Sequence, residues 1–136
     1  MNIAAFVFIL MLLAHLLADY PLQGWLAQAK ARKYWENSPK KTRYDHIPAL
    51  ICHALMWAIL VALPPMMATM FWGVGNPERL WFLWGLIPAQ ALLHACIDHC
   101  KATYGTINLW QDQLFHLTQI LIWWGSWIGI CQVWAQ

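Results

Sequence analysis

Four long apolar runs constrain this chain more than any other feature of its sequence. A helix that crosses the hydrocarbon core of a bilayer needs about 20 predominantly apolar residues, and the runs cover about residues 2–20, 47–73, 80–100 and 108–135. Soluble domains carry about 25% charged residues, whereas this chain has 10% charged and 61% hydrophobic residues. The sequence therefore predicts an all-α integral membrane four-helix bundle, with a single transmembrane domain over residues 1–136.

The basic residues predict how the bundle is oriented. Six of the eight lysines and arginines lie between the first and second runs: Lys30, Arg32, Lys33, Lys40, Lys41 and Arg43. Loops rich in Lys and Arg stay on the cytoplasmic side, so both termini are expected outside, in the bacterial inner (cytoplasmic) membrane. We expect this loop to contact anionic lipid headgroups rather than nucleic acid. Self-association is also expected, because four short helices offer little surface for a complete pocket.

The same loop has a helical periodicity. Its apolar side chains recur at the spacing of one helix face, at Leu22, Trp25, Leu26 and Ala29. This spacing predicts a cytoplasmic amphipathic helix between the first and second spans, lying on the membrane surface.

Histidines and aspartates recur four residues apart in three of the runs. The pairs are His15 with Asp19, His94 with Asp98, and Asp112 with His116. At 3.6 residues per turn each pair shares one helix face. Because the chain runs back and forth, these six residues and His53 fall within one layer, at depths of roughly 0–12 Å from the cytoplasmic interface at 1.5 Å per residue. Ionisable groups inside a membrane cost about 3 kcal/mol each and require mutual compensation.

A shared divalent metal ion would supply that compensation. Imidazoles and carboxylates are ligands of zinc, iron and manganese; we expect zinc first, with iron or manganese as alternatives. We predict five metal ligands: His15, His53, His94, Asp98 and His116. Asp19 and Asp112 are predicted to act as catalytic bases or to orient the ligands. These seven side chains are more than the four ligands of one tetrahedral zinc ion. The sequence therefore leaves open whether the site holds one ion or two. Taken singly, His53 is explained by packing, and Asp19 or Asp112 by helix capping.

Several stretches together resemble a known family. They are LAHLLADYPLQ (13–23), LLHACID (92–98) and WQDQLFHL (110–117), with His53 between them. The order HLLAD, H, HxxID, DQxxH resembles that of an uncharacterised family, a domain of unknown function found in small polytopic membrane proteins of bacteria and phages. The resemblance implies a helical membrane bundle without an established activity. The polar positions that it carries over are His15, Asp19, Gln23, His53, His94, Asp98, Asp112, Gln113 and His116.

Three functions compete for this pattern. The first is a membrane-embedded metal-binding protein, in particular a metal-dependent hydrolase acting near the cytoplasmic headgroups; the His and Asp placement is similar to that of membrane-bound metal-dependent hydrolases, by analogy only. The second is a proton or cation transporter, although the outer halves of the runs are nearly all apolar. The third is a non-catalytic phage or bacterial interaction protein with a structural His/Asp network. Whether the chain is an enzyme is left open by the sequence.

Overall fold

A computed structural model describes residues 2–131 and 133. Its α-helices are α1 (Ile3–Asp19), α2 (Leu26–Ala29), α3 (His46–Trp72), α4 (Leu80–His99) and α5 (Leu109–Cys131). Short helical turns join them: η1 (Arg32–Trp35), η2 (Lys40–Thr42), η3 (Pro77–Arg79) and the π-helical turn η4 (Cys100–Tyr104). No strand occurs among the described residues, which confirms the predicted all-α class.

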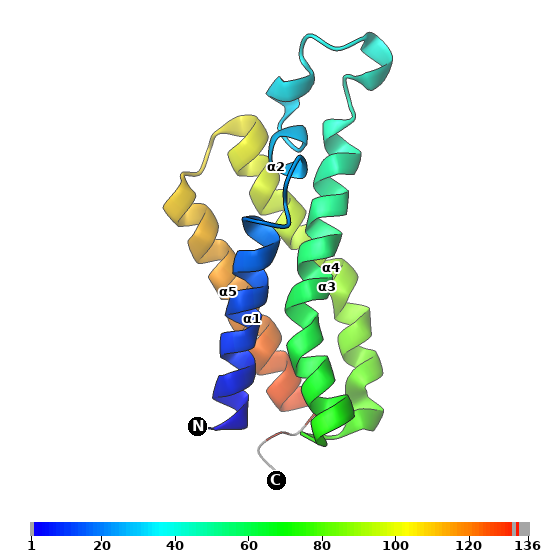
Figure 1. The fold of residues 1–136 in the computed structure, drawn as a ribbon, viewed down its shortest axis with the longest axis vertical. Coiled ribbons are helices and arrows are strands. Elements are labelled where there is room, and N and C mark those ends of the chain that lie inside the picture. The colour runs from blue at the N-terminus through cyan, green and yellow to red at the C-terminus, as the bar shows by residue number, and fades with distance from the viewer. Residues whose placement is uncertain (1, 132, 134–136) are drawn as a thin grey trace.

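The long helices, α1, α3, α4 and α5, run along the long axis of the molecule (Figure 1). α3 packs against α1 and α4, and α5 contacts α1, α3 and α4. The start of α1 and the end of α5 lie at one end, and the segment from α2 to η2 covers the other end (Figure 1). The expected fourth run, 108–135, extends past Cys131, and its residues 132, 134 and 135 lie outside the described residues.

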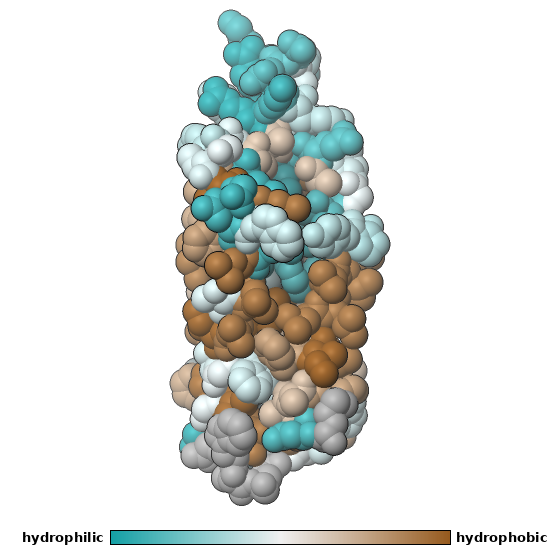
Figure 2. Space-filling view, turned by 90° about the vertical axis from the view of Figure 1, so that its left-hand side faces the viewer, coloured by the Kyte–Doolittle hydropathy of each residue, from teal (hydrophilic) through white to brown (hydrophobic). Residues whose placement is uncertain are grey.

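Three helical segments are long and apolar enough to cross a membrane. They are Lys40–Trp72, Pro77–Tyr104 and Leu109–Cys131, while α1 is also apolar but has 17 residues. Large apolar side chains, such as Ile59, Phe82 and Leu121, remain exposed on their outer faces, and Figure 2 shows a hydrophobic belt beneath a hydrophilic end. Helices that are apolar on both faces are typical of membrane spans, so the structure indicates a membrane protein.

The interior divides into an apolar part and a polar part. Toward the termini the core is apolar, with fully buried Val7, Leu83, Ile120 and Trp127. Toward the opposite end, buried histidines, aspartates and glutamines lie among small apolar residues such as Ala18 and Ala54. Packing of the apolar part therefore holds the four long helices in register where their polar side chains meet.

The prediction of an amphipathic helix after the first run was wrong about its length. Gly24 adopts a left-handed φ of 48°, and α2 that follows has only four residues before the chain continues into η1. Gln23 and Lys30 are buried, and the indole of Trp35 donates a hydrogen bond to the carbonyl of Ala29 at 2.7 Å. The segment folds back because its polar side chains bond to groups between the long helices, which a continuous surface helix would not allow.

Candidate metal centre

All seven predicted site residues lie together at the end covered by α2. His53, His94 and His116 are fully buried, and Asp98 and Asp112 nearly so. The side chain of Asp19 is 8% exposed. They come from α1, α3, α4 and α5, so each of the four long helices contributes to the cluster.

The three pairs spaced four residues apart are close in space. The nearest nitrogen and oxygen atoms lie 3.5 Å apart in His15 and Asp19, 3.6 Å apart in His94 and Asp98, and 3.4 Å apart in Asp112 and His116. The helical spacing therefore identified true neighbours.

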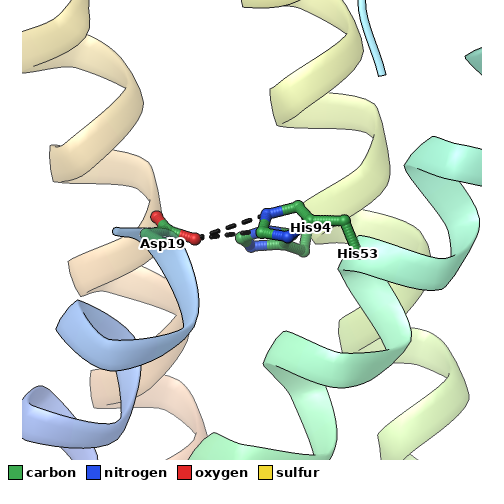
Figure 3. A group of neighbouring side chains, drawn as sticks. All are labelled: Asp19, His53 and His94. Atoms are coloured by element: carbon green, nitrogen blue, oxygen red, sulfur yellow. Dashed lines mark hydrogen bonds and ion pairs between the residues drawn. The ribbon is translucent and has the colours of Figure 1, made fainter. Parts of the chain in front are cut away.

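Three imidazoles from three helices point their Nε2 atoms at the same carboxylates. His53 Nε2 lies 3.4 Å from Asp19 Oδ1 and 3.2 Å from Asp98 Oδ2. His94 Nε2 lies 3.9 and 3.6 Å from the same two oxygens, and His116 Nε2 lies 3.5 Å from Asp98 Oδ1. Figure 3 shows the Asp19 carboxylate reaching from α1 toward the rings of His53 and His94.

These separations suit ligands of one ion. Zinc binds imidazole nitrogen and carboxylate oxygen at about 2.0–2.2 Å, so two ligand atoms around a tetrahedral ion lie about 3.3–3.6 Å apart. Two overlapping groups have suitably placed ligand atoms: Asp19, His53 and His94, and also His94, Asp98 and His116.

Several atoms in the cluster are buried without a hydrogen bond. Asp19 Oδ1, Asp112 Oδ1 and His116 Nε2 have no hydrogen-bond partner within the described part of the chain. Buried polar atoms are nearly always paired, because an unsatisfied group costs about 1–3 kcal/mol. A cation near these atoms would satisfy oxygen and nitrogen lone pairs at once, so the donor set fits a metal.

Ring stacking fixes the orientation of two histidines. The ring of His94 stacks on those of Trp57 and His116, with both ring centroids 4.2 Å away and interplanar angles of 20° and 26°. Packing therefore holds these rings with their Nε2 atoms directed at the carboxylates, since neither Nδ1 atom has a hydrogen bond within the described residues.

His15 lies beside the cluster but outside both ligand groups. Its Nδ1 accepts a 2.9 Å hydrogen bond from the indole of Trp57, and its Nε2 lies 3.2 Å from Gln113 Oε1. An indole only donates, so Nε2 carries the proton and donates to Gln113. The ligand role of His15 stays a prediction, because binding a metal would require the ring to give up one of these two hydrogen bonds.

The two glutamines that the family resemblance carried over also contact the cluster. Gln23 Nε2 lies 3.0 Å from His53 Nε2, and Gln113 donates a 3.1 Å hydrogen bond to Asp112 Oδ2. Spacing alone did not single them out, because neither is ionisable.

Sequence reasoning missed two lysines. Lys30 donates to Asp98 Oδ2 at 2.6 Å, and Lys101 donates to Asp112 Oδ2 at 2.5 Å. Lys30 was interpreted only as one of the basic residues of the cytoplasmic loop, and Lys101 was not assigned to the site. The signal that could have found Lys101 is its position three residues after Asp98, at the end of a run. No such signal marks Lys30, which lies eleven residues beyond Asp19.

Local structure places Lys101 and Asp112 opposite one another. α4 continues into η4, which ends at Gly105 in the left-handed conformation. α5 then begins with a reciprocal cap, since Asn108 and Gln111 each bond the other's backbone N–H through their side chains, at 2.9 and 3.0 Å. Because these residues cap the helix, the carboxylate of Asp112 is not needed there and points into the cluster.

Comparison with known proteins identifies the family. The family model described as "Protein of unknown function (DUF3307)" matches residues 7–135. The chain belongs to the DUF3307 family. No curated protein and no solved structure matches it. The function of this DUF3307 member is therefore argued from its geometry.

An open cavity of about 350 Å³ lies beside the cluster. Its lining includes Asp19, Asp98 and Asp112 together with Lys30 and Lys101. Hydrophilic colour reaches down from the capped end on the face over α1 and α5 (Figure 2). In this DUF3307 member, the carboxylates thus border an open cavity, although Asp98 and Asp112 themselves are nearly buried.

Proposed function

We propose that this DUF3307 member is a membrane-embedded four-helix bundle that binds one divalent metal ion and hydrolyses a phosphate or carboxylic ester of a lipid near the cytoplasmic headgroups. The observation that carries the proposal is the convergence of three Nε2 atoms on the carboxylates of Asp19 and Asp98, beside buried atoms that have no hydrogen bond within the described residues. Perturbed polar groups in a cleft are a common mark of a functional site.

The ligands that we assign are His53, His94, His116 and Asp98, with zinc as the preferred ion. Both candidate groups contain His94. Its Nε2 atom has one lone pair and can bind only one ion. A single ion is therefore favoured over two. His15 is assigned the role of supporting the cluster, because Trp57 and Gln113 occupy its ring nitrogens.

The carboxylates outside this ligand set have separate roles. A bound zinc-type ion would lower the pKa of a water molecule and stabilise negative charge on an oxygen. Asp19 lines the cavity and, among the described residues, has no lysine partner, so we assign it as the base that accepts a proton from the attacking water. The water oxygen bonds to phosphorus or carbon, the ester oxygen leaves, and Asp19 returns the proton to it. Asp112 is held by Lys101, and its Oδ1 lies 3.4 Å from His116 Nε2, so we place it beside the ligand set, where it adds negative charge next to the ion.

The membrane setting supports a lipid substrate. We place the basic segment from Lys30 to Arg43 in the cytoplasm by the positive-inside rule and α1 as a fourth span. The cavity then opens at the level of the cytoplasmic headgroups, because it lies at the α2 end of the molecule.

Elemental analysis by mass spectrometry of detergent-purified protein tests this proposal. We expect about one zinc, iron or manganese ion per chain in the wild type, loss of the metal in His94→Ala and in His116→Ala, and retention in the control His99→Ala, because His99 lies outside both ligand groups. The metal-loaded wild type should then release product from a panel of lipid phosphates and esters. An absence of metal after incubation with divalent ions would reject the proposal.

A structural polar network is the second candidate. Lys30 and Lys101 already compensate two of the cluster's three carboxylates, and a satisfied buried network specifies a fold without chemistry. This candidate predicts that metal content is negligible and that alanine variants of the histidines alter only stability.

A further inference from the structure

Two ammonium groups stand at the cavity beside the candidate metal centre. Lys30 reaches it from the end of α2 and Lys101 from η4. Each Nζ donates one hydrogen bond to a carboxylate, whereas an ammonium carries three N–H donors. Both lysines therefore keep donors for a further acceptor in the cavity.

The charge of the site favours an anion. Three carboxylates and two ammonium groups line the cavity and leave one net negative charge when the imidazoles are neutral. A divalent ion bound to the histidines changes this to one net positive charge. An uncompensated charge is costly where water is scarce, so the metal-loaded site gains from a negatively charged ligand.

The rim of the cavity contains apolar as well as polar groups. Tyr20 and Leu109 line it and are 57% and 53% exposed, while Gln23 and Gln113 supply amide groups on the inner side. A ligand with a charged head and an apolar remainder matches both kinds of lining.

We infer that Lys30 and Lys101 form a phosphate-binding pair that selects a phosphate ester as the substrate of this site. Lysine ammonium groups are common point-charge partners of phosphate. The inference rests on the proposed function and narrows its substrate class, because an uncharged ester would leave the net positive charge without a partner.

Calorimetric titration of full-length protein in detergent micelles tests the pair. The titrants are inorganic phosphate and dihexanoyl phosphatidic acid, with uncharged dihexanoylglycerol as the comparison, each added to zinc-loaded and metal-free samples. The variants are Lys30→Gln and Lys101→Gln, with Lys40→Gln as the matched control, since Lys40 is an exposed lysine of η2 and does not line the cavity.

We expect both cavity variants to bind the phosphates roughly ten- to a hundredfold more weakly, the effect of losing a charge-assisted hydrogen bond. Lys40→Gln should bind as the wild type does, and Lys101→Arg should retain most of the affinity. Tighter binding of phosphatidic acid than of inorganic phosphate identifies a lipid headgroup as the source, whereas equal binding identifies a free phosphate compound. Lys30 is buried, so Lys101→Gln decides the matter if Lys30→Gln does not fold.

Equal phosphate affinity in the wild type and in Lys101→Gln, or no phosphate binding at all, would overturn the inference. Elemental analysis of the same samples separates this failure from that of the proposed function. Metal-loaded protein without lysine-dependent phosphate binding contradicts the phosphate-binding pair alone. Wild type that takes up no metal contradicts the proposed function, and the phosphate-binding pair with it, because the metal-free cavity keeps one net negative charge.

Discussion

The Nε2 atoms of His53 and His94 lie 3.2 Å apart, although 41 residues separate the two histidines in the chain. One proton between them would make a hydrogen bond, but both atoms also lie within 4 Å of Asp19 Oδ1 and Asp98 Oδ2. A single proton cannot satisfy all of these atoms, whereas one cation can bind both imidazoles and Asp98 with Asp19 close beside it. This relationship is therefore the most direct structural reason to expect a metal ion.

Metal binding should stabilise the protein through these two histidines. A ligand present at a hundred times its Kd stabilises the folded state by about 2.7 kcal/mol, so zinc should raise the melting temperature of detergent-purified wild type by roughly 5–10 °C. His94→Gln should lose this rise, and His46→Gln, which lies outside both ligand groups, should keep it. Thermal unfolding with and without zinc measures the difference; an equal rise in all three proteins would place the metal elsewhere.

Lys30 should be required for stability because it neutralises buried Asp98. The side chains of Lys30 and Asp98 are only 11% and 2% exposed, and removing one partner of a buried ion pair costs about 3–5 kcal/mol. We expect Lys30→Met to be destabilised by that order, and Lys30→Met combined with Asp98→Asn to recover more than half of the loss. Denaturant unfolding of metal-free protein in micelles measures this.

The exposed Lys40 supplies the control for this cycle. Lys40→Met should change stability by less than about 0.5 kcal/mol, as surface substitutions usually do. Additive effects of the Lys30 and Asp98 substitutions would show that the two groups do not interact energetically.

Trp57 should contribute more to stability than an equally buried tryptophan without a hydrogen bond. Both Trp57 and Trp123 are 0% exposed, but Trp57 donates to His15, while Trp123 Nε1 has no partner within the described residues. Trp57→Phe should therefore be about 1–2 kcal/mol more destabilising than Trp123→Phe. Equal losses in a denaturant titration of the two variants would mean that packing alone accounts for Trp57.

The proposed orientation predicts which side of the membrane each loop faces. In a background without the four natural cysteines, Asn2→Cys should react with a membrane-impermeant maleimide in intact cells. Ser38→Cys, between η1 and η2, should react only after lysis, because basic segments stay in the cytoplasm. The reverse labelling pattern would invert the orientation and place the candidate centre at the outer headgroups.

The sequence predicted those features of this protein that depend on local periodicity. The apolar runs correspond to α1, α3, α4 and α5, because run length and helical spacing need only neighbouring residues. The pairing of His94 with Asp98 and of Asp112 with His116 follows from the same 3.6-residue repeat. Their common layer follows from a chain that runs back and forth between short turns.

Only the tertiary structure decided which side chains of that layer contact one another. Lys30 lies 68 residues from its partner Asp98, and no local pattern distinguishes it from the exposed lysines of the same loop. The prediction of a continuous amphipathic helix there was wrong. The spacing of apolar residues carries no information about the buried partners that Gln23 and Lys30 have on α3 and α4. The role of His15 likewise depends on Trp57 of α3 and Gln113 of α5. Periodicity places a side chain on a helix face, but the packing of one helix against another determines which atoms it meets.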